Sequence, residues 1–304
     1  MVLLLFAFQW DPLSIGAGAD TPGRGGVYSG GIGGVYYNPG GTGLMESMEI
    51  MGMHTELDFG TSYNFFCVVI PFKGLNAGFY FSQIGTGDIP VTEAGDTMPG
   101  ADYPEVVYMG TASFRASAYS ITLSRRWRDK GFGLNFKFLE MKMYSYYGSG
   151  FSMDAGFFYR KQRMFLGVSI KDGLNTGMKW NTGLKESILP EFRFDFGYRI
   201  LENVGVFNDG ILISGGISRI YRVHFDFDRF LNLDKPIYHA GFEVNPDGVL
   251  SMRAGVESVT DDLRGRWNVC FGLGVKSEHL YINYAFTTKQ EIRGNHNISM
   301  GYRW

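Results

Sequence analysis

The sequence predicts an all-β protein, a transmembrane antiparallel up-and-down β-barrel of about 14 strands with a glycine-rich N-terminal plug segment. Three observations favour this class. The 304 residues include 43 glycines and 16% aromatic residues, but only 19% charged residues. The longest apolar run, residues 2–8, is much shorter than the roughly 20 residues that a membrane-spanning helix needs. From residue 47 onward, short segments of alternating polarity follow one another, separated by Gly, Asn, Asp and Pro.

Composition and charge exclude several other classes of protein. A hydrophobic content of 45% excludes a disordered chain. A net charge of −2 lacks the basic excess of nucleic-acid binders, so no nucleic-acid partner is expected. Two cysteines, Cys67 and Cys270, form neither a disulfide framework nor a CxxC metal site. We therefore expect no metal and no cofactor.

Residues 1–11 contain an apolar run that is typical of the core of an export signal. No Lys or Arg precedes Arg24, and no clear small-residue cleavage site follows the run. We expect residues 1–11 to be either the remnant of an export signal or the start of the mature chain.

Residues 12–46 are expected to form a plug in the mouth or lumen of the barrel. Nine glycines fall within residues 16–34, where they permit close packing and turns with positive φ. A phosphate-binding loop is excluded because no Gly-Lys-Ser/Thr follows them. The candidate plug residues are Gly25, Gly26, Gly33, Gly34, Asn38 and Pro39.

Residues 47–304 are predicted to form the barrel itself. In residues 192–200, Phe192, Phe194, Phe196 and Tyr198 alternate with charged or small residues, which predicts a strand. About 14 strands are expected, with one candidate left for a loop or a hairpin extension, because a closed bacterial barrel has an even number. The candidates are 47–58, 61–71, 75–83, 115–126, 131–143, 150–160, 163–171, 191–200, 211–218, 220–230, 237–245, 249–258, 266–276, 279–288 and 295–304, and more weakly 106–114.

The connections between these strands differ in length. Residues 58–61, 161–163 and 245–249 predict tight turns, whereas residues 84–105 and 171–190 predict long loops. Short turns at one end and long loops at the other are typical of outer-membrane barrels. Residues 84–105 carry five acidic residues, and we expect them to be extracellular, either contacting a partner, capping the pore or forming a solvated surface loop.

The direction in which the apolar faces point decides between a soluble and a membrane protein. Alternation alone is compatible with both. The apolar faces are rich in Phe and Tyr, which suits contact with lipid, and the other faces lack the Lys and Glu that protect exposed sheets from aggregation. An open edge in lipid would leave unpaired amides, so the sheet must close. We therefore predict aromatic side chains facing the lipid bilayer and polar ones facing the lumen.

Seven histidine, acidic and arginine residues are expected to share the lumenal side of neighbouring strands. His224, Asp226 and Asp228 lie two residues apart, so their side chains share one face of a strand. Such a set also suits a metal site or a catalytic centre, but paired charges in a narrow lumen are the simpler interpretation. We predict no catalytic residue, no enzyme activity and a polar ladder of Arg193, Asp195, Arg199, Arg222, His224, Asp226 and Asp228.

Four methionines follow the plug segment closely. They are expected either to line a hydrophobic ligand pocket beside the plug or to be ordinary packing and lipid-facing residues. They are Met45, Met48, Met51 and Met53.

Several short motifs occur in an order that extends over nearly the whole chain. They are 13–16 with the glycine run, 36–39 (Tyr-Tyr-Asn-Pro), 153–160 (Met-Asp-Ala-Gly-Phe-Phe-Tyr-Arg), 189–199 (Leu-Pro to Gly-Tyr-Arg), 239–243 (His-Ala-Gly-Phe-Glu), 250–255 (Leu-Ser-Met-Arg-Ala-Gly), 284–286 (Tyr-Ala-Phe) and 294–299 (Gly-Asn-His-Asn-Ile-Ser). This order resembles the PorV/UPF0164 group of FadL-like outer-membrane β-barrel proteins. The chain departs from the group's pattern at 23–26, at 38–44 and at Asn283, where the group commonly has Asp.

The resemblance implies a 14-stranded FadL-type barrel with an N-terminal plug in the bacterial outer membrane. It implies passive passage of small hydrophobic molecules, with a hydrophobic small molecule or a lipid as ligand. The alternative is a PorV-like shuttle or adaptor of a type IX secretion apparatus, with secretion-system proteins as partners. The last strand, which ends at Trp304, resembles the signal that the barrel-assembly machinery recognises.

Overall fold

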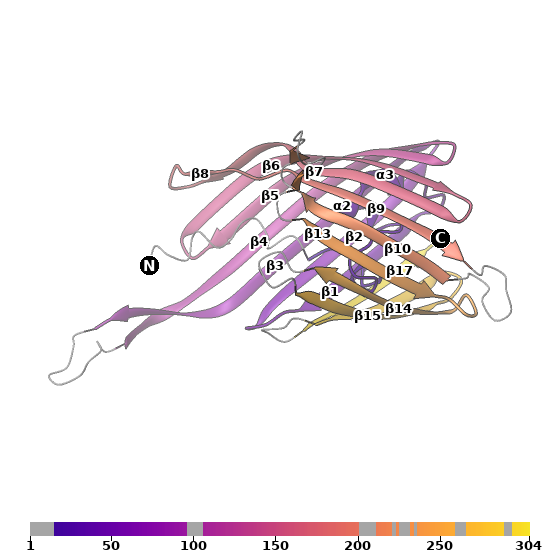
Figure 1. Cartoon of the computed structure of the whole chain (residues 1–304). Helices are drawn as coiled ribbons and strands as arrows, with labels where there is room; N and C mark the ends of the chain where they lie inside the picture. The colour runs from indigo at the N-terminus through magenta and orange to yellow at the C-terminus, as the bar shows by residue number, and fades with distance from the viewer. Residues whose placement is uncertain are drawn as a thin grey trace.

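In the computed structural model the strands follow one another around a closed wall (Figure 1). The structure describes residues 15–95, 106–200, 211–220, 223–224, 232–233, 236–258, 266–288 and 294–304. The strands are β1 (Glu49–Glu56), β2 (Thr61–Phe72), β3 (Leu75–Ala94), β4 (Val106–Trp127), β5 (Lys130–Met143), β6 (Tyr146–Lys161), β7 (Met164–Trp180), β8 (Lys185–Glu186), β9 (Glu191–Ile200), β10 (Ile211–Ile220), β11 (Val223–His224), β12 (Asn232–Leu233), β13 (Ile237–Val244), β14 (Leu250–Ser258), β15 (Trp267–Lys276), β16 (Leu280–Thr287) and β17 (Asn295–Arg303).

The wall is closed by the pairing of its first strand, β1, with its last, β17, and the pairing of β6 with β7 completes the circle of neighbours. Every pairing in it is antiparallel, and β8 pairs only with β7. Without β8, the large sheet in the described part of the chain is a closed barrel of 14 strands, which confirms the predicted fold class.

The two faces of the wall differ as predicted. On β4, Ile121 on the outer face is 57% exposed, whereas Thr122 on the inner face is fully buried. The same alternation recurs on β9, where Phe194 and Phe196 are exposed and Asp195 between them is buried. The large apolar side chains therefore face outward, and many of the polar ones face inward. Among the described residues, no helix is long and apolar enough to cross a membrane.

The predicted loop at 84–105 is wrong over much of its length, because β3 and β4 continue beyond the wall as a two-stranded arm (Figure 1). The last wall contacts of the two strands are Thr86 with Thr61 and Phe114 with Met143. Beyond them β3 and β4 pair only with each other. Pro90 indicated a break in the strand, but a strand with an unpaired edge accommodates proline. The weak candidate 106–114 is part of β4 and forms one strand of this arm.

Two other boundaries also differ from the prediction. Residues 171–190 are not a simple loop, because β7 extends to Trp180 and β8 pairs back onto it. Of the candidate strand 220–230, Ile220 is the last residue of β10 in the wall, whereas residues 223–224 form β11, which pairs only with β12. The wall position after β10 belongs to β13.

The two ends of the barrel have different connections. We call the end where β1 begins and β17 finishes the terminal end; there Trp304 N donates to Met48 O over 3.1 Å. Short turns at 73–74, 128–129 and 162–163 lie at this end. The arm and β8 lie at the opposite end, the arm end, which also has the tight turn between β1 and β2. Residues 144–145 form a second short turn at the arm end, and the ten residues 201–210 connect β9 to β10 at the terminal end. The predicted asymmetry of short turns and long loops is therefore only partly confirmed.

A charge on the outer face provides a test of this orientation. We expect Ile121→Arg to destabilise the barrel in phospholipid vesicles by about 2–4 kcal/mol, since a cation there would lie in hydrocarbon. Thr111→Arg is the matched control, because Thr111 is an exposed residue of the same strand on the arm. Urea unfolding measures both variants, and equal stability of the two would contradict the lipid-facing assignment.

Candidate functional site

Residues 15–48, which we call the N-terminal segment, lie inside the barrel. They contain three single-turn helices, α1 (Asp20–Gly23), α2 (Gly34–Tyr37) and α3 (Pro39–Thr42), and of the whole segment only Glu46 is exposed. Inward-facing side chains around the wall hydrogen-bond to its backbone. These bonds are Tyr63 Oη to Gly16 O (2.9 Å), Asn135 Nδ2 to Val35 O (2.8 Å), Ser169 Oγ to Tyr37 O (2.9 Å) and Ser299 Oγ with Ala19 N (2.9 Å).

The stretch Asn38-Pro39-Gly40 touches the backbone of the wall. A Cβ atom at Gly40 would lie 2.7 Å from the carbonyl oxygen of Gly131 on β5 and 2.8 Å from that of Gly156 on β6. The Asn38 amide donates to Phe157 O (2.9 Å) on β6 and, more weakly, to a carbonyl of β7. The wall glycines are therefore needed for this contact, because any side chain would separate the two backbones.

A second contact of the same kind lies on the other side of the lumen. A Cβ atom at Gly25 would lie 2.6 Å from Val256 O and 2.7 Å from Ala240 O, on β14 and β13. Gly25 also has a φ of 67°, a conformation that L side chains rarely adopt. Cβ atoms at Gly241 or Gly255 would collide with residues 24–25.

The other predicted plug glycines have different neighbours. Gly26 packs against His239 of β13, whose Nδ1 lies 2.6 Å from Gly25 O. Gly34 lies against the Tyr28 ring of the segment itself, and Gly33 lies near the Tyr37 ring.

Arg24 links the N-terminal segment to the wall through an ion pair. Its guanidinium pairs with Asp20 (2.8 Å) and with Glu243 on β13, and Glu243 also pairs with Arg253 on β14 (2.8 Å). Burial alone would lower the pKa of Arg24, but Glu243 and Asp20 outweigh burial and raise it. Arg24 is therefore a permanent cation held between two carboxylates. Sequence reasoning missed this group, because residues 24 and 243 have no sequence relation that links them.

Two residues of the predicted polar ladder hold the N-terminal segment. Arg193 Nε lies 2.7 Å from Asp195 Oδ2, and both side chains are buried on the inner face of β9. Arg193 also donates to Gly26 O, and Asp195 accepts from Tyr28 N over 3.2 Å. The pair therefore satisfies backbone groups of the segment.

The remaining ladder residues are not brought together in the described part of the chain. Arg199 is half-buried near the end of β9, where its backbone N donates to Arg163 O (2.8 Å). His224 lies on β11, outside the wall, and its side chain is outside the described residues. Arg222, Asp226 and Asp228 are also outside the described residues. Their part in a ladder stays a prediction.

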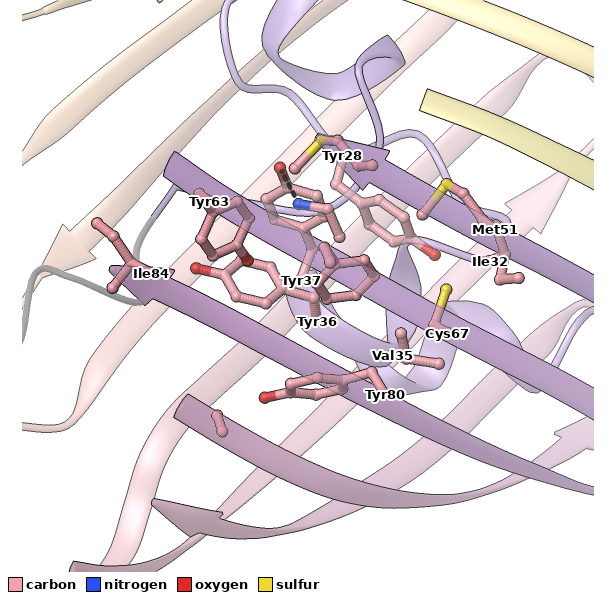
Figure 2. Close-up of a cluster of buried hydrophobic side chains, with 14 of the residues drawn as sticks. Tyr28, Ile32, Val35, Tyr36, Tyr37, Met51, Tyr63, Cys67, Tyr80 and Ile84 are labelled. Atoms are coloured by element: carbon pink, nitrogen blue, oxygen red, sulfur yellow. Dashed lines mark hydrogen bonds between the residues drawn. The ribbon is translucent and has the colours of Figure 1, made fainter. Parts of the chain in front are cut away.

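The centre of the lumen is a cluster of aromatic rings (Figure 2). Tyr36 meets Tyr37 edge to face at 4.9 Å between ring centroids and Phe65 of β2 at 6.1 Å. Tyr28 stacks on Tyr37 at 5.7 Å. Burial raises the pKa of Tyr28 well above its ordinary value, so the phenol stays protonated and donates to Gly31 O over 2.8 Å.

An apolar inner surface continues from these rings toward the arm end. Of Met45, Met48, Met51 and Met53, the structure buries Met51 and Met53 as packing residues of this cluster, and a ligand pocket lined by them stays a prediction. Sequence reasoning missed most of this surface because both faces of β2 are apolar, so that alternation of polarity is weak there. Its other members from the wall strands include Ile84, Ala116, Ala118, Leu139, Met141 and Met178.

The pairing of β6 with β7 is interrupted. Ala155 pairs with Ile170 and Met153 with Leu174, so three residues of β7 lie opposite the single residue Asp154. Asp172, in the middle of this bulge, has a positive φ of 55°. Lys137 Nζ lies 2.7 Å from carboxylate oxygens of both Asp154 and Asp172 and so bridges the two acidic residues at the bulge.

An apolar pocket lies on the outer face beside this bulge. It has a volume of about 580 Å³ and extends over β3–β7 and β9. Gly133 and Gly156 contribute to it, and a Cβ atom at Gly133 would collide with Pro39 O on the inner side. Only a single layer of backbone therefore separates this pocket from the N-terminal segment. The other lining residues include Leu123, Phe132, Leu134, Phe157, Val168 and Ile170.

The fold is similar to those of solved transport proteins. The P. putida toluene transporter TodX matches with a TM-score of 0.61 at 11% identity, over 95% of this chain and 98% of that one. The Ralstonia pickettii toluene transporter TbuX gives a TM-score of 0.62 at 10% identity, again over 95% and 98%. A Pseudomonas aeruginosa FadL homologue gives 0.56 at 11% identity, with the same coverage. No protein-family model and no curated protein matches the sequence.

These likenesses confirm the predicted FadL-like barrel fold. The finer resemblance to the PorV/UPF0164 group stays a prediction.

Replacing a wall glycine tests the contact with the N-terminal segment. We expect Gly156→Ala to destabilise the protein by about 1–3 kcal/mol, because the new Cβ atom would collide with the Asn38 side chain. Gly52→Ala is the matched control, since a Cβ atom there would lie 4.0 Å from the carbonyl oxygen of Phe65. Urea unfolding in vesicles gives the stability, and proteolysis of residues 15–48 reports their release. Equal results for the two variants would contradict the contact.

The Arg193–Asp195 pair is tested by removing one or both charges. We expect Arg193→Met to cost about 3–5 kcal/mol, because it leaves a buried carboxylate without its partner. The double variant Arg193→Met/Asp195→Leu should cost less than the single variant, since it leaves no uncompensated charge. The midpoints of urea unfolding measure both, and a double variant less stable than the single one would refute the buried pair.

Proposed function

We propose that the protein is a bacterial outer-membrane channel that gives small hydrophobic molecules a passive route, with the N-terminal segment as its plug. The observation that carries this proposal is the apolar inner surface that runs from Tyr36 and Phe65 toward the arm end. A pore for polar solutes would have a polar, water-filled lumen instead. The names of TodX and TbuX as toluene transporters support the same class of solute.

The interior suits apolar solutes because its polar groups are already paired. Arg24, Arg193 and Lys137 each lie against carboxylates, so they offer little to a charged solute. Contacts between rings and methionine side chains are weakly directional, and flexible methionines adapt to ligands of different shape. The solute class is therefore small and apolar or aromatic.

The route out of the barrel, in this proposal, passes through the wall at the β6–β7 bulge. There the pairing is interrupted, and the outer pocket of about 580 Å³ lies beside it. A hydrophobic solute that leaves sideways enters lipid without crossing water, which avoids the cost of exposing apolar surface.

Uptake of a hydrophobic fluorescent dye tests the channel. N-phenyl-1-naphthylamine brightens in membranes and is excluded by an intact outer membrane. We expect cells producing the protein to take it up several-fold faster than cells without it. Ala118→Trp, which fills the apolar interior, should remove most of this gain, whereas Ala77→Trp on the outer face of the neighbouring strand should not. Uptake no faster than in cells without the protein would refute the proposal.

The second candidate function is the secretion adaptor, and the arm favours it. Val106, Tyr108 and Met109 are each at least 60% exposed on the arm, which offers apolar contacts and unpaired strand edges to a protein. Affinity purification from native membranes distinguishes the two candidates. Recovery of secretion components, lost when residues 88–112 are replaced by a short turn, would favour the adaptor.

A further inference from the structure

The terminal end of the barrel carries a dense group of cations, which we call the cationic rim. The β4–β5 and β6–β7 turns lie side by side there, and Arg160 N donates to Asp129 O over 2.9 Å. Residues 125–130 and 160–163 together contain seven Arg or Lys and one acidic residue, Asp129. The seven are Arg125, Arg126, Arg128, Lys130, Arg160, Lys161 and Arg163.

Two members of the rim are engaged with the N-terminal segment. Arg126 pairs with Glu46, and Arg160 donates to Ser29 O. The inference below therefore rests on three other cations, Arg125, Lys130 and Lys161.

These three cations continue the outer face of the wall. Side chains two residues apart on a strand share a face. Arg125 therefore follows Ile121 and Leu123 on β4, and Lys130 precedes Phe132 on β5. Lys161 pairs with Met164, which is 45% exposed. The cations thus stand where the lipid-facing columns of side chains end.

Aromatic side chains accompany the cations at the same level. Trp127 is 59% exposed, and Lys130 Nζ lies 5.2 Å from the centroid of its ring. A pocket of about 780 Å³ opens between β6, β7 and β9, lined by Tyr159, Lys161, Gln162, Arg163, Met164 and Tyr198. Trp and Tyr are enriched at the boundary between hydrocarbon and water. The rim is therefore at headgroup height.

We infer that the cationic rim binds the phosphate groups of anionic phospholipids in the membrane leaflet at the terminal end. This inference rests on the proposed membrane position of the barrel. Lys and Arg bind phosphate by charge-assisted hydrogen bonds. The three cationic side chains lie on the outer face, next to outward-facing apolar side chains. A single phospholipid can therefore place its phosphate against the cations and its acyl chains against the apolar side chains. A soluble anion has no apolar group that would contact the exposed side chains of Trp127, Met164 and Tyr198.

Lipid retention by the purified barrel tests the inference. The rim variant is Arg125→Gln/Lys130→Gln/Lys161→Gln. The matched control is Arg115→Gln/Lys142→Gln/Lys179→Gln, which removes three exposed cations toward the arm end. Each protein is titrated in detergent with phosphatidylglycerol or with zwitterionic phosphatidylcholine, and native mass spectrometry counts the bound lipids. One cation near an anionic membrane surface contributes about fivefold in binding, so the rim variant should bind phosphatidylglycerol roughly a hundredfold more weakly.

We expect the control variant to bind phosphatidylglycerol as the wild type does. Equal losses in the two variants, or equal retention of both lipids by the wild type, would overturn the inference. Displacement of phosphatidylglycerol by millimolar inorganic phosphate would assign the rim to free anions instead. If the rim variant does not fold, Lys161→Gln alone should still show a loss of about fivefold.

Dye uptake by cells separates this inference from the channel itself. Normal uptake with no lipid preference refutes only the lipid site. Absent uptake with a clear lipid preference refutes only the channel.

Discussion

Closure of the sheet is the constraint on which the rest of the structure depends. A strand in lipid has no water to satisfy its amides, so each strand must pair on both sides. Antiparallel pairing around the whole circle fulfils this condition and also divides the side chains into an outer and an inner set. The outer set is largely apolar, which suits contact with hydrocarbon. The inner side chains need not be apolar. They include the charged, polar and small residues that hold the N-terminal segment inside the barrel.

The N-terminal segment is held in place by close contact between its backbone and the backbone of the wall. The N-terminal segment has three single-turn helices and several turns, which satisfy many of its amides internally, and other backbone groups take partners from the wall. Wall side chains such as Asn135 and Ser169 supply them. Glycines on both surfaces allow the approach, as Gly40 against Gly156 illustrates. The high glycine content thus has a structural cause, since strand glycines would otherwise weaken a sheet.

The sequence allowed the wall to be predicted, because a period of two residues assigns each side chain to one face. Phe194, Asp195 and Phe196 lie as that period requires. The arm was not predicted, since Pro90 looks like a strand end unless the unpaired edge is known. The ion pair of Arg24 with Glu243 could not be predicted either, because these residues are 219 positions apart and only the closed barrel brings them into contact. The apolar interior could not be recognised from β2, because apolar side chains lie on both of its faces. Tyr63 and Phe65 lie on the inner face and Phe66 lies on the outer face.

The arrangement of the contacts bears on the proposed passage of a solute through a tightly packed barrel. The segment is fastened near Arg24 and Gly25 to β13 and β14, and near Asn38 to β5–β7. Between these two attachments lie Tyr28, Tyr36 and Tyr37, which pack ring against ring and are also held by hydrogen bonds such as Tyr28 N to Asp195 and Ser169 Oγ to Tyr37 O. Ring contacts re-form in many geometries at small cost, whereas breaking a buried ion pair costs several kcal/mol. In the proposed channel, a solute on the route past the β6–β7 bulge meets the second attachment, because residues 38–40 lie directly behind the wall at Gly133 and Gly156. Opening that route therefore requires this attachment to loosen, whereas the ion pair of Arg24 with Glu243 can stay in place.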